Sequence, residues 1–451
     1  MVKVVGTPGF YDPKARNQEV RTADDWYALA AIYYFLRTGT TLFVTAGSGR
    51  QELLQKAGLL QRAGVFTAAD CATIRNLVDQ TTVVVEAPAL TQEAIARRFD
   101  TIVRKLMTAK GKRLWTTTQF GEVVDVRSRQ HGLAGLLTAM RELGVDVTTK
   151  PLLTKVEAQL FPVKRFQDTS MLFGAAGLMK SLVGLMQDGQ IAASHDVELE
   201  NLVAQITRQD YADQWDYATG RAGAIDALAT LAEYSQQAKY WDALKKQTAA
   251  LFDETNDILR YCLQDTDDLT GLGFAHGLTG LGWTLYHVGQ LLNVPVYQAK
   301  GDELLQVVTA LTEDFLQHHA LNVMNLSWCE GLAGIGSGLL RAYQTGIAAK
   351  AESSKLLDNI TDQLVHHFYQ QSPALCHGLA GTLAFFNDRQ TFQPSTANAE
   401  AAELVAEYMT ATANDGLIFP DETMRTHVLD YGVGQLGCLA QLHRYIRLFQ
   451  G

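Results

Sequence analysis

Apolar residues recur with helical spacing through the last two thirds of the chain, in stretches such as Leu278 to Leu292 and Leu332 to Tyr343. A more polar helical pattern lies between successive apolar stretches, for example from Val197 to Gln209 and from Lys300 to Gln317. An apolar face that recurs about every 3.6 residues is typical of helices packed on one side. The pattern therefore predicts an all-α chain built of helix pairs.

A Gly-x-x-Gly motif opens each apolar stretch and occurs seven times, at intervals of 42 to 57 residues. Its glycine pairs are Gly132 and Gly135, Gly174 and Gly177, Gly220 and Gly223, Gly277 and Gly280, Gly331 and Gly334, Gly378 and Gly381, and Gly434 and Gly437. Glycines at i and i+3 share one helix face and remove Cβ atoms where neighbouring backbones crowd. We also expect the first glycine to let the entering turn take positive φ. Because each internal glycine costs about 1 kcal/mol, seven repetitions indicate a packing requirement.

Two helices in each repeat of roughly 50 residues are typical of an α-helical array. Such an array is either an open solenoid or a closed ring. The residues just before the first glycine differ in polarity from repeat to repeat. This variation favours a closed ring whose inner-helix starts converge on a pocket.

Two of the five cysteines, Cys329 and Cys376, each lie two residues before the first glycine of consecutive repeats, and His377 follows directly. Equal offsets in adjacent repeats point to neighbouring places at the mouth of the ring. Two thiolates and one imidazole form a Cys2His zinc set with the fourth tetrahedral position open, and sulfur ligands favour zinc over magnesium or calcium. The alternative is two buried cysteines and a core histidine that bind nothing.

Two further candidates lie at corresponding helix starts. His276 directly precedes the first glycine of the fourth repeat, and Asp216 lies four residues before that of the third. Histidine transfers protons near neutral pH, and a nearby carboxylate would fix its tautomer and raise its pKa. Taken singly, Asp216 is explained as a helix N-cap and His276 as a helix-start histidine bonded to backbone. His131 occupies the same position in the first repeat without evident chemistry.

In this order, and within the repeated glycine motifs, these residues resemble the lanthionine synthetase cyclases, the LanC-like superfamily. The resemblance covers about residues 115 to 451. It implies a seven-fold α/α toroid over residues 131–451 that holds one Zn²⁺ ion. The implied metal ligands are two cysteines and a histidine: Cys329, Cys376 and His377. By the same resemblance His276 matches the family's catalytic acid/base, and Asp216 the aspartate that supports it.

The resemblance implies a cyclase that adds cysteine thiols of a ribosomally made precursor peptide to dehydroalanine or dehydrobutyrine. The products are lanthionine or methyllanthionine thioether rings. Two alternatives remain open: a non-catalytic zinc-binding toroid that is a scaffold for a peptide or partner protein, and a LanC-like enzyme that adds glutathione. Asn325 stands where some members have arginine, and Glu330 where an aromatic residue often follows the first cysteine. Peptide recognition or rate is therefore expected to differ.

The first hundred residues lack the repeat. The segment from Gly6 to Pro13 resembles the end of a Ser/Thr kinase activation segment, and a helical pattern from Asp25 resembles the large helix that follows. We interpret residues 1–105 as an incomplete kinase C-lobe and 106–130 as a linker, an arrangement similar to class IV lanthipeptide synthetases. Because no glycine-rich loop, β3 lysine or catalytic-loop aspartate is present, kinase activity is not expected. Separate kinase or lyase subunits are candidate partners.

Composition and hydropathy limit the expected partners and cellular location of the protein. The formal net charge of −10 argues against a nucleic-acid partner. No basic region followed by an apolar stretch occupies residues 1–10, and no apolar run of roughly 20 residues could span a bilayer. Five cysteines, an odd and sparse set, do not indicate a disulfide framework. We therefore expect a cytoplasmic protein without a transmembrane segment.

Overall fold

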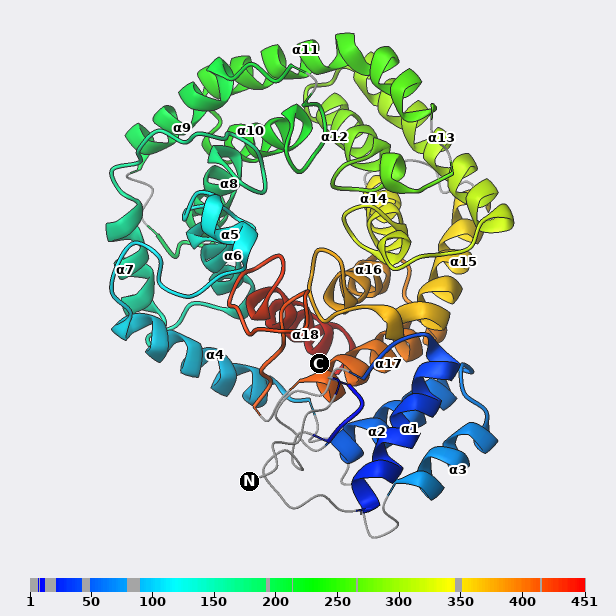
Figure 1. Cartoon of the computed structure of the whole chain (residues 1–451). Helices are drawn as coiled ribbons and strands as arrows, with labels where there is room; N and C mark the ends of the chain where they lie inside the picture. Colours follow the sequence, from blue (N-terminus) through cyan, green and yellow to red (C-terminus); the bar gives the residue numbers. More distant parts are fainter. Residues whose placement is uncertain are drawn as a thin grey trace.

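The computed structural model describes residues 7, 9–12, 22–42, 49–78, 90–191, 195–212, 214–264, 267–344, 351–413 and 416–450. Over these ranges the chain forms eighteen α-helices and no β-strand. The prediction of an all-α chain is thus confirmed. Figure 1 shows an inner circle of helices surrounded by a second layer, with three N-terminal helices at one side.

The seven inner helices each begin directly after the first glycine of a repeat. They are α6 (Leu133–Leu143), α8 (Ala175–Gln187), α10 (Arg221–Ser235), α12 (Leu278–Leu291), α14 (Leu332–Gln344), α16 (Leu379–Phe392) and α18 (Gln435–Phe449). Each packs against the next, and α18 packs against α6 (Figure 1). The array is therefore a closed ring, and the open solenoid is wrong.

The outer layer consists of the more polar helices and one helix from before the repeats. Its members are α7 (Lys150–Leu160), α9 (Asp196–Arg208), α11 (Ala238–Cys262), α13 (Pro295–His318), α15 (Ala351–His367), α17 (Thr396–Thr412) and α4 (Gln92–Thr108). Helix α13 begins before the predicted Lys300, because proline is favoured in the first turn of a helix. Helix α4 packs on α18 and α7, so the predicted domain boundary at residue 105 falls inside an element that contacts the ring.

Close backbone approach explains the glycine motif. A Cβ on Gly280 would lie 2.1 Å from the carbonyl oxygen of Phe274 and 2.9 Å from the Cβ of Tyr217, which belongs to the preceding repeat. The second glycine of every repeat meets an equivalent neighbour, as predicted. The expectation of positive φ is wrong, because the first glycines have extended backbone, with φ −142° at Gly132 and −126° at Gly277.

A closed circle of backbone hydrogen bonds joins the loops before the inner helices. In each repeat the residue two positions before the first glycine donates its N–H to the corresponding carbonyl of the next repeat, at 2.9 to 3.2 Å. The donors run in order around the ring: Gln130, Leu172, Ala218, Ala275, Cys329, Cys376 and Gly432, which donates to Gln130. Cys329 and Cys376 therefore occupy neighbouring positions on one circle.

The N-terminal helices are α1 (Thr22–Thr38), α2 (Gly49–Arg62) and α3 (Ala68–Leu77), and α2 packs against α17 (Figure 1). Helix α1 also reaches α17, because the buried hydroxyls of Tyr34 in α1 and Tyr408 in α17 lie 3.0 Å apart. The short helix α5 (Gln119–Val123) lies within the predicted linker. Much of the kinase-like segment, including Gly6 and Pro13, lies outside the described residues, and the kinase interpretation stays a prediction.

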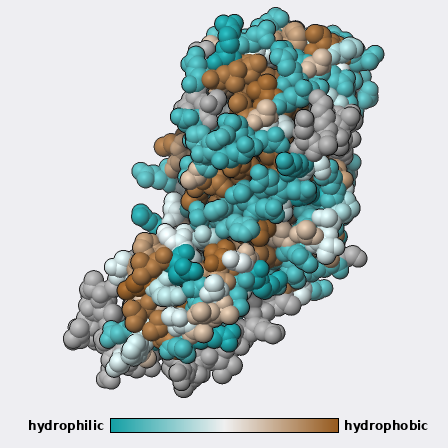
Figure 2. All heavy atoms as spheres, turned by 90° about the vertical axis from the view of Figure 1, so that its right-hand side faces the viewer, coloured by the Kyte–Doolittle hydropathy of each residue, from teal (hydrophilic) through white to brown (hydrophobic). Residues whose placement is uncertain are grey.

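Polar side chains cover most of the face drawn in Figure 2, with separate apolar patches between them. Helix α1 carries a stripe of exposed apolar residues on one side: Trp26, Leu29, Ile32, Phe35 and Leu36. Among the described residues no helix is long and apolar enough to cross a bilayer.

Candidate metal and acid–base site

The loops that precede α14 and α16 bring the two repeat-register cysteines together. The N–H of Cys329 donates to the carbonyl of Cys376 at 3.2 Å, and the Cα atoms are 5.6 Å apart. The two sulfurs are joined as a disulfide, which the odd cysteine count did not predict. The ligand atoms of Cys329, Cys376 and His377 all lie within 4.8 Å of one another. The structure thus brings together the three predicted ligands.

A disulfide and a metal site are alternative uses of these two sulfurs, because only a thiolate binds a metal. In the reduced state two thiolates and an imidazole would form the Cys2His donor set, with a fourth position open. His377 Nδ1 lies 2.9 Å from Glu422 Oε2, which leaves Nε2 as the ring nitrogen available to an ion. A carboxylate on the second nitrogen is common at histidine-ligated metal sites, where it fixes the ring and its tautomer. These residues therefore fit a metal ion.

Glu422 was not predicted, because it has no equivalent at a fixed distance from the other glycine motifs. It lies in the segment before α18, and its N–H donates to the carbonyl of Val433 at 3.2 Å. This bond holds the segment against the loop that opens the seventh repeat. The contact is long-range and follows no register, so no pattern in the chain signals it.

His276 and Asp216 form a pair from adjacent repeats, with His276 Nδ1 2.9 Å from Asp216 Oδ2. Burial alone would lower the pKa of His276, but the hydrogen bond and charge of Asp216 outweigh it and raise that pKa above its ordinary value. Asp216 also accepts from the Thr219 N–H at 2.6 Å, within the turn before α10. The N-cap of α10 is Gly220 and receives no side-chain bond, so the alternative of Asp216 as a helix N-cap is wrong. About a third of the His276 side chain is exposed, so a substrate can reach it.

The two departures from the family pattern have different surroundings. Asn325 is buried, and its Nδ2 donates to Asp268 Oδ1 at 2.8 Å. The charge of Glu330 adds to the rise in the pKa of His276, so Glu330 acts on the acid–base pair. A Cβ on Gly273 would lie 2.5 Å from the Cys329 carbonyl oxygen, which makes glycine necessary for this close approach.

A second histidine–aspartate pair has the same register but a closed environment. His131 Nδ1 lies 2.8 Å from Asp430 Oδ2, and Asp430 precedes the first glycine of its repeat by four positions, as Asp216 does. Both side chains are buried, and Trp115 Nε1 donates to Asp430 Oδ1 at 2.7 Å. The ring of Phe120 in α5 packs edge-on against His131. This pair is therefore structural, and the position can hold histidine without chemistry.

Comparison with known proteins identifies the repeat region. The family model described as "Lanthionine synthetase C-like protein" matches residues 125–448. Among solved structures the chain is similar to one described as "Nisin cyclase", with 17% sequence identity and a TM-score of 0.51. The similarity covers 78% of this chain and 93% of that chain, and indicates a similar fold. No curated protein sequence matches.

Proposed function

Since this chain belongs to the lanthionine synthetase C-like family, as the match over residues 125–448 establishes, we propose that it is a zinc-dependent cyclase. It would form lanthionine or methyllanthionine rings in a ribosomally made precursor peptide. The observation that carries the proposal is the meeting of three donor atoms within 4.8 Å, from Cys329, Cys376 and His377. The His276–Asp216 pair supplies the acid–base group that the same reaction requires.

The three donors would hold one zinc ion, and Glu422 would orient His377. A zinc ion at this position supplies thiol activation, since metal binding deprotonates a coordinating thiol. In the addition, a peptide cysteine gives up its thiol proton to solvent, and its sulfur bonds to the β-carbon of the dehydrated residue. The electron pair of the broken C=C π bond moves toward the α-carbon, which must then gain a proton.

His276 is the group proposed to deliver that proton. Its raised pKa keeps a larger fraction of the ring protonated near neutral pH, which suits a general acid. The short contact between its Nδ1 and Asp216 points the Nε2–H away from the carboxylate, toward the substrate. Asp216 is a positioning residue, because it acts through His276. General acid–base help of this kind typically contributes 10²–10⁴-fold.

The test begins with chemically reduced protein, zinc and a dehydrated precursor peptide. Cyclisation consumes free thiols without changing peptide mass. Cys376→Ala should lose both zinc and thiol consumption, whereas His276→Ala should keep zinc and slow cyclisation. Full zinc content in the cysteine variant refutes the ligand assignment, and an unchanged rate in the histidine variant removes it from the mechanism.

Two other results would redirect the proposal. A mass increase equal to glutathione, when glutathione is present, would identify a thiol-adding enzyme. Retained zinc with no thiol loss, on a peptide that a known cyclase closes, would identify a scaffold.

We further propose that residues 1–105 form a kinase C-lobe-like unit of a class IV-type synthetase. Its support is the sequence resemblance together with the exposed apolar stripe of α1. Such a stripe is typical of a surface that a partner covers. A separate kinase or lyase subunit would supply the dehydrated peptide in the same cytoplasmic setting.

A further inference from the structure

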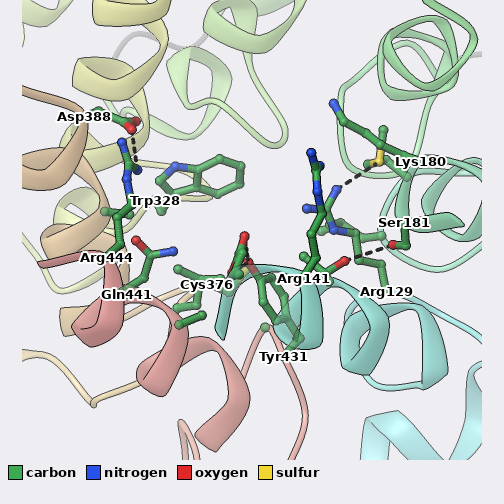
Figure 3. A pocket seen from close by; sticks show the side chains of 18 of the residues that line it. Arg129, Arg141, Lys180, Ser181, Trp328, Cys376, Asp388, Tyr431, Gln441 and Arg444 are labelled. Carbon is green, nitrogen blue, oxygen red and sulfur yellow. Dashed lines mark hydrogen bonds and ion pairs between the residues drawn. The ribbon is translucent and has the colours of Figure 1, made fainter. Parts of the chain in front are cut away.

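A cavity of about 880 Å³ lies within the ring of inner helices, and Figure 3 shows it from close by. We call it the central bore. Residues three positions before the first glycine line it in six of the seven repeats: Arg129, Met171, Tyr217, Trp328, Leu375 and Tyr431. The residues directly before those glycines, which include His276 and His377, are not in its lining. The bore is therefore distinct from the acid–base pair, although Cys376 contributes to its wall.

Cationic side chains outnumber carboxylates in the central bore. The cations are Arg129, Arg141, Lys180, Arg341, Arg444 and Arg447. The carboxylates are Glu142, Asp188 and Asp388. The whole chain has the opposite balance, with a formal net charge of −10. A cavity whose lining carries an excess of positive charge attracts anions.

Several of these cations already have an ion-pair partner or a structural role. Four of them form ion pairs with carboxylates: Arg141 with Asp188, Arg444 and Arg341 with Asp388, and Lys180 with Asp226. Arg141 and Arg447 also lie in the last turns of α6 and α18, where positive charge stabilises the free helix carbonyls. These cations need no ligand.

Arg129 is different because it precedes α6 and lies at no helix C-terminus. Its Nη1 is 3.6 Å from Met171 Sδ, and its guanidinium is 5.9 Å from the centre of the Tyr431 ring. No carboxylate of the described part of the chain forms an ion pair with it. Both oxygens of Glu142 accept the Tyr431 hydroxyl at 2.9 Å, and burial raises the pKa of Glu142. Asp226, the other acid whose charge acts on Arg129, is already ion-paired.

We propose that the central bore binds a small anionic molecule whose phosphate or carboxylate group pairs with Arg129. A guanidinium offers two parallel N–H donors to such a group. Figure 3 shows Arg129 and Arg141 facing Trp328 and Arg444 across the bore. The aromatic rings that share the wall give apolar contact to the rest of the ligand. The volume lies within the range typical of small-molecule sites.

Calorimetric titration of the full chain with inorganic phosphate, and separately with citrate, tests this site. Binding should be saturable with one site per chain, equally in chelator and after zinc loading, which separates it from the proposed cyclase. Arg129→Gln should weaken binding at least about tenfold, the effect of losing one charge-assisted hydrogen bond. Arg129→Lys should retain part of it. Arg260→Gln, on the exposed side of α11, is the matched control and should bind as the unaltered chain does.

Phenylglyoxal, which modifies arginine, gives a readout on unaltered protein in case Arg129→Gln fails to fold. Phosphate or citrate should slow modification of Arg129 and leave that of Arg260 unchanged, as measured by peptide mass spectrometry. The probe that protects identifies the anion as a phosphate or a carboxylate. Equal rates at Arg129 with and without both probes, or binding unaffected in a folded Arg129→Gln variant, would overturn the site.

Discussion

The three histidines that directly precede a first glycine, His131, His276 and His377, have different surroundings on the same framework. Each contacts a carboxylate through Nδ1, at 2.8 to 2.9 Å. His131 is buried, whereas about a third of the His276 and His377 side chains is exposed. Only His276 and His377 are exposed enough to exchange protons with a substrate or to contact an ion. Environment, and not position in the repeat, therefore decides which histidine a substrate or an ion can reach.

The pH dependence of cyclisation tests the role of Asp216. A general acid must be protonated, so the rate should fall as pH rises past the pKa of His276. Asp216→Asn keeps a hydrogen-bond acceptor but removes the negative charge that raises this pKa, while burial, which lowers it, remains. The alkaline limb of the kcat profile should therefore move to lower pH in the variant. An alkaline limb at the same pH in both proteins would show that Asp216 does not set the protonation of His276.

Glu422→Gln tests the support behind the candidate metal ligands. The neutral amide still accepts a hydrogen bond from His377 but loses the carboxylate charge that fixes the ring and its tautomer. Zinc affinity should fall by about 10 to 100-fold, the usual effect of removing such a partner. Competition with a chromogenic chelator on reduced protein measures it. Glu407→Gln is the control, because Glu407 is an exposed partner of Arg62 far from the loop. Equal affinities in both variants would exclude a role for Glu422.

At the scale of the helices, the glycine motif makes an energetic prediction. Gly280→Ala places a methyl group 2.1 Å from a backbone carbonyl oxygen, which cannot move without shifting the ring. We expect a loss of about 1–3 kcal/mol or more in the free energy of unfolding, the usual cost of overpacking. Gly58→Ala in α2 is the matched control, since its Cβ meets nothing within 4 Å. That change should stabilise by about 0.5–1 kcal/mol in urea unfolding. Equal effects of both changes would contradict the packing explanation.

The first residues of the inner helices could be predicted closely from the sequence, and those of the outer helices less closely. The pattern beginning at Leu278 coincides with the start of α12, because a glycine motif and an apolar face agree there. The start of α13 was missed by five residues, because its first turn, from Pro295, is exposed or half-buried and carries no apolar period. The expectation of a positive φ at Gly132 was wrong, because the reason for glycine there is a different one. A Cβ at this position would collide with a nearby carbonyl group.

At the scale of the whole molecule, the sequence revealed that Cys329 and Cys376 occupy the same position in consecutive repeats. It did not reveal the structural reason. That reason is the backbone circle in which both residues bond to their neighbours. Closure depends on the N–H of Gly432 and the carbonyl of Gln130, which are main-chain groups and leave no repeated pattern in the sequence. The Gln130 side chain lies where a Cβ on Gly432 would be, which favours glycine at this position. The position of Glu422 could likewise not be predicted, because its contact with His377 joins two segments that share no sequence pattern.

A substitution in helix α4 can test where the ring ends and the N-terminal unit begins. Its buried side chains include Phe99, and Gln92 and Arg98 bond to α18 through His443 and Gln435. If α4 is part of the ring, Phe99→Ala should cost about 3–5 kcal/mol and speed amide hydrogen exchange in α18 and α7. The reason is that both helices lose the apolar cover that α4 gives them.

Leu53→Ala in α2 is the matched change on the other side of this boundary. Leu53 is as buried as Phe99, but α2 packs on α1, α3 and α17 and has no major contact with α18. Faster exchange should therefore appear in α1, α3 and α17, with α18 and α7 protected as before. Should Phe99→Ala instead release α1 to α3 and leave α18 protected, α4 would belong to the N-terminal unit. The predicted division at residue 105 would then stand, and the ring would hold together without α4.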